Sequence, residues 1–190
     1  YTYEENMHPI YVFSGVIGGG WAARAMHVGI DVIAADINPK MENRIRSAVE
    51  AASSSLDALT RGIDIPPKGH FTFTTDLIEM AKKSDFIQEN VPEVLEIKRN
   101  ALMTISKSTE SNVIISSSTS GYMPSELQKS MTHPERFVVG HPFNPVYLCP
   151  LVEVVGGVQT SDETKAAAKE FYQSIGMNTL MVRHEVPGNI

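Results

Sequence analysis

Short apolar runs alternate with longer segments of helical periodicity along most of this chain, and no other feature of the sequence limits its fold as strongly. A strand followed by a helix, repeated many times, is the pattern of a doubly wound parallel sheet with helices on both faces. The predicted strands are 10–13, 31–36, 71–74, 86–88, 113–116, 137–139, 151–155 and 179–182. The predicted helices are 18–28, 39–60, 76–82, 93–106 and 162–174. We therefore expect an α/β fold built on a doubly wound, mostly parallel sheet.

Glycines follow the first predicted strand, where a dinucleotide-binding fold needs a tight turn. Gly15, Gly18 and Gly20 stand there. In such folds the next helix points its N-terminus at the pyrophosphate, and an acidic residue at the end of the second strand binds the ribose hydroxyls. Asp36 ends the second apolar run, eighteen residues after Gly18, and no arginine follows it to accept a 2′-phosphate. The sequence predicts a Rossmann-type domain that prefers NAD to NADP; an ordinary glycine turn before a strand-ending aspartate is the alternative.

The first position of the glycine fingerprint is not a glycine. When the acidic residue is the anchor, the three positions fall on Phe13, Gly15 and Gly18. A phenylalanine at the first position is unfavourable wherever φ is positive and crowds the neighbouring backbone. A second register, Gly18-x-Gly20-x-x-Ala23, satisfies the looser G-x-G-x-x-A form but moves the strand away from its apolar residues. We prefer the first register with this defect, and whether Phe13 impairs NAD binding stays open at this point.

Four polar residues in the second half could together oxidise an alcohol. They are Ser120, His141, Asn144 and Glu153. A histidine can take the proton of a carbinol near neutral pH, a carboxylate can fix its tautomer, and a serine hydroxyl can hold the substrate oxygen. Each of these residue types alone is more often a cap, a turn residue or a surface polar group. The prediction therefore depends on the combination.

The motifs S-S-S-T-S-G, M-T-H-P-E-R and H-P-F-N-P-V-Y-L-C-P-L-V-E-V-V-G-G resemble those of the 3-hydroxyacyl-CoA dehydrogenase superfamily. That family carries a serine, a His-x-x-Asn and a glutamate twelve residues after the histidine, and Glu153 follows His141 by twelve. The resemblance covers about residues 9–190 and is most specific in the second half. It is strongest to the branch that oxidises L-carnitine. The L-gulonate branch, the short-chain 3-hydroxyacyl-CoA branch and a non-catalytic protein on the same fold remain alternatives.

The resemblance implies NAD-dependent oxidation of a 3-hydroxyl by hydride transfer. In that reaction His141 is the general base and Glu153 holds its ring. Ser120 binds the substrate oxygen and also lies on the nicotinamide side, while Asn144 positions substrate and nicotinamide. No metal is needed, and the six histidines show no H-x-x-x-H spacing.

Two further cofactor contacts are implied by the resemblance alone. They are Glu93 and Lys98, in the segment E-N-V-P-E-V-L-E-I-K. The alternative for them is an exposed charge pair on the surface of a helix.

The resemblance also divides the chain. Residues 1–8 are expected to be a loose leader, residues 9–186 the dinucleotide-binding domain, and residues 187–190 the start of a hinge. In the family a helical second domain follows this hinge, completes the substrate pocket and forms the homodimer interface. We therefore expect the chain alone to bind dinucleotide better than it turns over substrate.

Composition narrows the class of partner. The single cysteine, Cys149, cannot form a disulfide within the chain, and no apolar run approaches the ~18 residues of a membrane span. The net charge of −6 disfavours binding to nucleic acid, which needs a basic surface. We expect a cytoplasmic protein that binds NAD and a small-molecule substrate.

Overall fold

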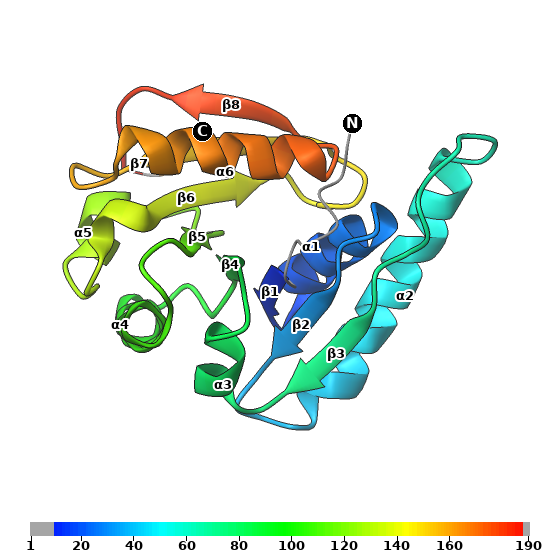
Figure 1. Cartoon of the computed structure of the whole chain (residues 1–190), viewed down its shortest axis with the longest axis horizontal. Helices are drawn as coiled ribbons and strands as arrows, with labels where there is room; N and C mark the ends of the chain where they lie inside the picture. The colour runs from blue at the N-terminus through cyan, green and yellow to red at the C-terminus, as the bar shows by residue number, and fades with distance from the viewer. Residues whose placement is uncertain (1–9, 188–190) are drawn as a thin grey trace.

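The computed structural model describes residues 10–187, which form an eight-stranded sheet with helices on both faces (Figure 1). The strand order is β3-β2-β1-β4-β5-β6-β7-β8. Every neighbouring pair is parallel except β6 and β7, which are antiparallel. The predicted doubly wound, mostly parallel sheet is confirmed. The predicted leader and the hinge residues 188–190 lie outside the described residues.

The predicted elements all occur, with ends shifted by a few residues. The strands are β1 Ile10–Phe13, β2 Val32–Ala35, β3 Phe71–Thr74, β4 Phe86–Glu89, β5 Ile114–Ser117, β6 Phe137–Pro142, β7 Leu151–Gly156 and β8 Asn178–Val182. The helices are α1 Val16–His27, α2 Met41–Leu59, α3 Leu77–Ala81, α4 Leu95–Ser108, α5 Pro124–Gln128, the 3₁₀ helix η1 Pro134–Arg136 and α6 Asp162–Ser174. The sequence did not predict α5 or η1, which span five and three residues.

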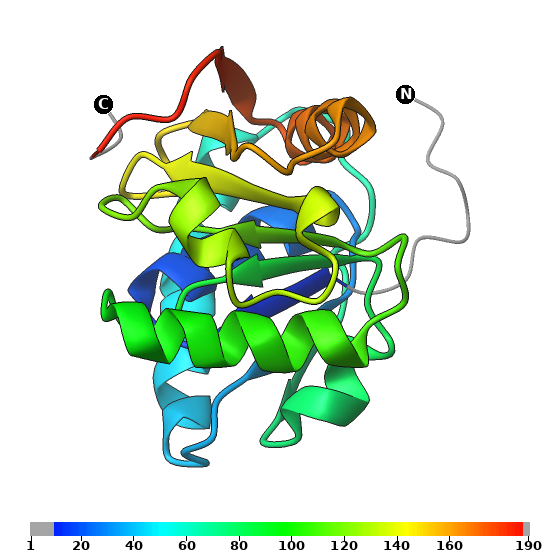
Figure 2. The same cartoon turned by 90° about the vertical axis from the view of Figure 1, so that its left-hand side faces the viewer.

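Two apolar layers enclose the sheet. Helices α1, α2 and α6 cover one face, and α3, α4 and α5 cover the other (Figures 1 and 2). Alternate residues of β1 supply both layers: Ile10 and Val12 pack on the first, Tyr11 and Phe13 on the second. Because β1 is buried on both faces, it is apolar throughout, as expected of a central parallel strand.

The helix α6 shows how local sequence sets the ends of an element. The Ser161 hydroxyl accepts a hydrogen bond from the Thr164 amide at 3.0 Å and so caps the first turn. After the last turn Gly176 has a φ of +78°, a conformation that favours glycine. The predicted range, 162–174, is confirmed at both ends.

Strand β6 is longer than predicted, and the difference concerns the site. The sequence predicted a strand over 137–139 only, but the observed strand continues through His141 to Pro142. The antiparallel partner β7 extends β6, because it pairs with each residue from Val138 to Pro142.

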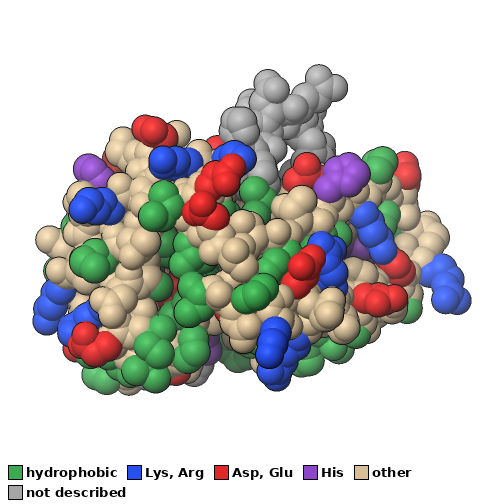
Figure 3. All heavy atoms as spheres, turned by 90° about the horizontal axis from the view of Figure 1, so that it is seen from below, with side chains coloured by type: hydrophobic (Ala, Val, Ile, Leu, Met, Phe, Trp, Pro, Cys, Tyr) green, Lys and Arg blue, Asp and Glu red, His purple; other side chains and the backbone are tan. Residues whose placement is uncertain are grey.

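The surface shows no single dominant charge on the face drawn in Figure 3, where acidic and basic side chains are interspersed among apolar ones. Among residues 10–187, no helix combines the length and the apolar character needed to cross a bilayer.

Candidate active site

The turn between β1 and α1 is built by two glycines. Gly15 precedes α1 with a φ of +122°, which L-residues with a side chain rarely adopt. A Cβ on Gly18 would lie 1.8 Å from the Phe13 carbonyl oxygen, so only glycine lets the helix lie this close to the strand. The first turn of α1 carries no acidic side chain, which leaves its positive dipole end available to an anion. This arrangement fits a pyrophosphate.

The structure places the turn where the preferred fingerprint register requires it. The alternative, Gly18-x-Gly20-x-x-Ala23, lies entirely within α1 and does not form the turn. Gly20 packs inside the molecule, where an added Cβ would lie 2.9 Å from the Cβ of Val146.

The backbone penalty expected at Phe13 does not arise. Among residues 10–187, only glycines have a positive φ. Phe13 is the last residue of β1, is 6% exposed and meets the Tyr11 ring edge-on, with centroids 5.2 Å apart. Phe13 is therefore a core residue on the side of the sheet covered by α3 and α4, and the positive φ that would have strained it is not required there.

Asp36 follows β2 directly, beside the glycine turn. Its Oδ1 accepts a hydrogen bond from the Asn38 amide at 2.8 Å, and its Oδ2 accepts one from the Ser14 hydroxyl. These contacts hold the carboxylate at the edge of the turn, where a ribose hydroxyl would need an acceptor. The sequence analysis did not identify Ser14.

His141 and Glu153 meet across β6 and β7. They are directly opposite in the antiparallel register, and His141 Nδ1 lies 2.7 Å from Glu153 Oε2. The Glu153 side chain is 1% exposed and that of His141 19%. Because Nδ1 is engaged by the carboxylate, Nε2 remains for proton exchange with a ligand.

A cavity of about 280 Å³ brings the predicted site residues together. The predicted residues in its wall are Glu93, Lys98, Ser120, His141 and Asn144. The cavity wall also contains Ile17, Asn90, Val91, Ser118 and Pro142, which the sequence analysis did not select. Ile17 lies in the first turn of α1, directly after the glycine turn, so the cavity adjoins the proposed dinucleotide site.

Ser118 is the centre of a hydrogen-bond network in this wall. Its Oγ accepts bonds from Gln88 Nε2 at 2.8 Å and Trp21 Nε1 at 3.1 Å, and donates to Asn90 Oδ1 at 2.7 Å. The signal that could have found Asn90 and Ser118 is their position: each directly follows one of two neighbouring parallel strands, β4 and β5.

Lys98 lies in a buried charge cluster. Its Nζ is 3.1 and 3.2 Å from the two carboxylate oxygens of Glu89, 3.2 Å from the Val91 carbonyl and 3.1 Å from Glu93 Oε2. The Lys98 and Glu89 side chains are 1% and 0% exposed. The alternative of an exposed Glu93–Lys98 pair on a helix surface is therefore wrong, and the sequence analysis missed Glu89.

The two carboxylates of this cluster differ in pKa. Burial raises the pKa of Glu89, against the opposing effect of the Lys98 charge and the Ser117 hydrogen bond. Burial also pushes the pKa of Glu93 upward, but the Thr119 hydroxyl and the Lys98 ammonium outweigh it and hold that pKa below its ordinary value.

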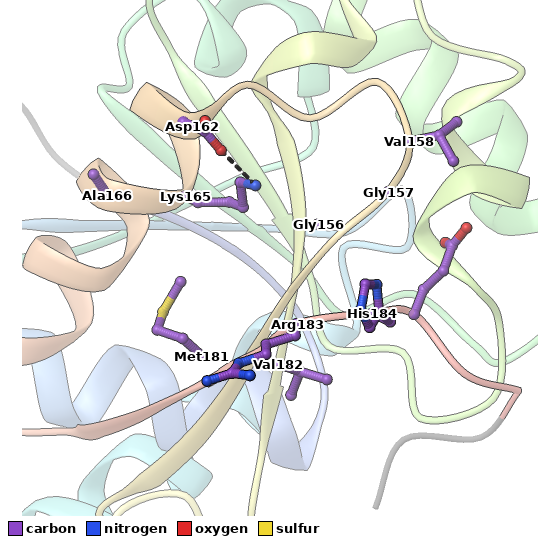
Figure 4. A pocket seen from close by; sticks show the side chains of 11 residues that line it. Gly156, Gly157, Val158, Asp162, Lys165, Ala166, Met181, Val182, Arg183 and His184 are labelled. Carbon is purple, nitrogen blue, oxygen red and sulfur yellow. Dashed lines mark ion pairs between the residues drawn. The ribbon is translucent and has the colours of Figure 1, made fainter.

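A larger hollow of about 780 Å³ lies beside α6 and β8 (Figure 4). Its wall contains an ion pair between Asp162 and Lys165, with a separation of 2.6 Å, and the side chains of Met181 and Arg183. None of the predicted site residues lines it, so we assign the site to the smaller cavity. Within residues 10–187 no three His, Cys, Asp or Glu side chains gather as metal ligands.

The fold and the site define a class of protein: a doubly wound dinucleotide-binding domain with a carboxylate-backed histidine in the adjoining cavity. The family described as 3-hydroxyacyl-CoA dehydrogenase, NAD binding domain, matches residues 11–186, and the chain belongs to this family. NAD is the cofactor of this family's domain.

Known proteins similar to the chain agree with this assignment. The chain is 49% identical over 179 residues to L-carnitine dehydrogenase of Pseudomonas putida, covering 93% of this chain and 55% of that protein. It is 46% identical to L-carnitine dehydrogenase of Staphylococcus epidermidis, covering 94% and 56%. A solved structure of 5-formyl-3-hydroxy-2-methylpyridine 4-carboxylic acid 5-dehydrogenase superposes with a TM-score of 0.88 at 35% identity, covering 96% and 60%. The chain spans about half the length of the curated relatives it matches.

Proposed function

We propose that this chain is the NAD-binding part of an enzyme that oxidises the 3-hydroxyl of L-carnitine to 3-dehydrocarnitine. The observation that carries the proposal is the 2.7 Å contact between His141 and Glu153 at the wall of a cavity beside the glycine turn. The choice of substrate depends on the relatives that are named L-carnitine dehydrogenase.

The proposed chemistry needs a base and a group that orients it. NAD, when bound, accepts the hydride of the carbinol carbon. His141 takes the hydroxyl proton through Nε2, and the Glu153 carboxylate keeps the hydrogen on Nδ1 and stabilises the imidazolium that forms. Ser120 donates a hydrogen bond to the substrate oxygen, and Asn144 orients the substrate. Removing the proton as the hydride departs avoids an unstabilised charge on the substrate.

In the proposed site, NAD is bound more by backbone groups than by side chains. The N-terminus of α1, entered through Gly15 and approached closely because of Gly18, holds the pyrophosphate. Asp36 binds the ribose hydroxyls. By resemblance Glu93 and Lys98 lie on the nicotinamide side, in the wall of the same cavity.

The remainder of the substrate pocket is proposed to come from a second, helical domain. A protein as long as the relatives would have room for it, since this chain covers 55% of the Pseudomonas putida protein. We propose that the same domain forms a homodimer interface. Dinucleotide titration and turnover, measured on this chain alone, separate the two parts: we expect binding of NADH with little or no turnover.

A substrate panel tests the function. L-Carnitine, L-gulonate and a short 3-hydroxyacyl-CoA are each offered with NAD to the full-length protein, and NADH formation is followed by absorbance. We expect the highest kcat/KM with L-carnitine. A preference for either of the others reassigns the substrate within the family, whereas NADH binding without turnover of any of them supports a non-catalytic role.

A further inference from the structure

The turn that carries Ser120 is held from both sides by one carboxylate oxygen. The Thr119 hydroxyl donates to Glu93 Oε1, and the Gly121 amide donates to the same oxygen at 3.0 Å. Ser120 itself is exposed and lines the cavity. The direction in which Ser120 points therefore depends on where Glu93 is held.

Glu93 needs a fixed partner if it is to hold the Ser120 turn in one position. Its side chain is 42% exposed and lies in the connection before α4. Outside the turn itself, from whose Thr119 hydroxyl it accepts a hydrogen bond, Glu93 is tied to the interior by the ion pair to Lys98, whose side chain is 1% exposed. Lys98 in turn is bound by Glu89 through both carboxylate oxygens, and Glu89 is fully buried.

Glu89 also reaches the same turn from its other end. Its Oε2 accepts a hydrogen bond from the Ser117 hydroxyl, and its backbone carbonyl accepts one from the Ser118 amide at 2.9 Å. Its Oε1 accepts from the Val91 amide at 2.5 Å. One buried carboxylate thus contacts the start of the segment 117–121 directly and the end of it through two further residues.

We propose that Glu89 is a positioning residue that fixes the Ser120 turn, through Ser117 on one side and through Lys98 and Glu93 on the other. The inference rests on the function proposed above, in which Ser120 binds the substrate oxygen. Glu89 has no contact with the cavity of its own, since it is not among the residues that line it. Its effect on turnover must therefore pass through the turn.

The substitution Glu89→Gln tests this in the full-length protein. The amide keeps the volume but presents an NH₂ group to the Lys98 ammonium or to the Val91 amide, so the turn loosens. We expect kcat to fall about 10-fold or more, because misplacing a substrate-binding group by about 1 Å can cost about 10²-fold in rate. The dissociation constant for NADH should change by a smaller factor than kcat, because the glycine turn and Asp36 are untouched and only the nicotinamide-side contacts of Glu93 and Lys98 shift. The control Glu96→Gln, whose side chain is 76% exposed, should match wild type.

A double-mutant cycle separates positioning from a general loss of structure. In a Ser120→Ala background the substitution Glu89→Gln should lower kcat by less than about 2-fold, because the group it positions is already absent. If the fold-losses in kcat of Glu89→Gln and Ser120→Ala instead multiply in the double variant, the proposal is overturned. So would a loss of NADH affinity with kcat unchanged.

Hydrogen exchange tests the same proposal without reference to turnover. In this chain we expect Glu89→Gln to speed exchange of the Gly121 amide by about 10-fold or more, while amides of α6 keep their protection. If the single variant does not fold, Glu89→Gln/Lys98→Met removes both buried charges together and should show the same faster exchange. Unchanged exchange at Gly121 overturns the proposal even if the enzyme oxidises L-carnitine. Faster exchange in a protein that oxidises none of the panel substrates leaves the turn assignment standing and removes the proposed function.

Discussion

The two halves of the site are held in place by opposite means. At the glycine turn the geometry depends on missing atoms, because a Cβ on Gly18 would collide with the Phe13 carbonyl. At the β6–β7 pair it depends on atoms that are present, because His141 and Glu153 meet side chain to side chain across two strands. The first half is a backbone turn that fits the pyrophosphate of a dinucleotide. The second half carries the side chains to which we assign the proton transfer.

This difference explains why Phe13 can occupy a position where the fingerprint has glycine. What the turn requires is space at Gly18 and a positive φ at Gly15. Phe13 precedes both and points into the core, so its side chain does not interfere with either requirement. No comparable freedom is expected at His141, whose imidazole is the base of the reaction proposed above.

The largest effect should come from the side-chain half. We expect His141→Gln to lower kcat by about 10²–10⁴-fold, the range of general base catalysis, with NADH affinity unchanged. The matched control is His133→Gln, since the His133 side chain is 45% exposed and, among residues 10–187, pairs only with the exposed Glu135. Steady-state kinetics and NADH titration measure the two quantities. If His141→Gln lowered NADH affinity as much as kcat, the glycine turn and the His141–Glu153 pair would not act as separate halves.

Phe13→Gly restores the fingerprint and tests whether the first position matters. We expect the free energy of unfolding to fall by about 3–5 kcal/mol, because a buried aromatic side chain is deleted, and NADH affinity not to improve. The variant Phe13→Leu keeps an apolar side chain and should lose less than about 1.5 kcal/mol. Denaturant unfolding and NADH titration provide the measurements. Tighter NADH binding in the glycine variant would show that the aromatic ring does obstruct the turn.

Gly18→Ala adds a single methyl group where the structure leaves no room. The new Cβ would lie 1.8 Å from a backbone oxygen, so α1 must move away from β1. We expect a loss of about 1–3 kcal/mol in the free energy of unfolding, with weaker NADH binding and an unchanged His141–Glu153 contact. Gly15→Ala meets nothing within 4 Å but must adopt a φ of +122°, so it should lose a similar amount through backbone strain. Intact NADH affinity in both variants would contradict the backbone account.

The smallest effect concerns Glu93 and depends on pH. Its pKa in the folded protein lies below the ordinary value of 4.5, so it contributes stability above that value and loses it as the pH falls through the lower, folded-state pKa. Because the side chain is 42% exposed, we expect Glu93→Gln to lower the free energy of unfolding at pH 7 by no more than about 1 kcal/mol. Unfolding curves from pH 7 down to about 3 should show the gap closing. If the difference in unfolding free energy between wild type and Glu93→Gln grew as the pH fell, the folded-state pKa of Glu93 would be raised rather than lowered.

Local pattern was enough to predict the sheet, and the spacing of the family motif was enough to predict the His141–Glu153 pair. Apolar runs mark the strands, and the spacing from His141 to Glu153 survives in the structure as a direct contact. Asp36 likewise lies at the end of β2, beside the glycine turn. These features depend on residues near one another in sequence or on motifs with fixed spacing.

The residues that sequence reasoning missed depend on which strand ends become neighbours. Glu89 ends β4 and Ser118 follows β5, and they meet the rest of the site only because those strands lie side by side in the sheet. Lys98 was hard to place for a related reason. Spacing along a helix does not reveal that Lys98, near the start of α4, packs against the buried carboxylate of Glu89. The short α5 and η1 were also not predicted.

The antiparallel step from β6 to β7 has a consequence for how such an enzyme can change. Strand register sets His141 opposite Glu153, so the connection 143–150 can change in length or sequence while these two side chains, the base and orienting acid of the proposed reaction, stay in contact. Asn144 sits in that connection, at the cavity. Selection for a different alcohol can therefore change the substrate-contacting residues of the connection, Asn144 among them, while the proposed proton transfer by His141 and Glu153 stays the same.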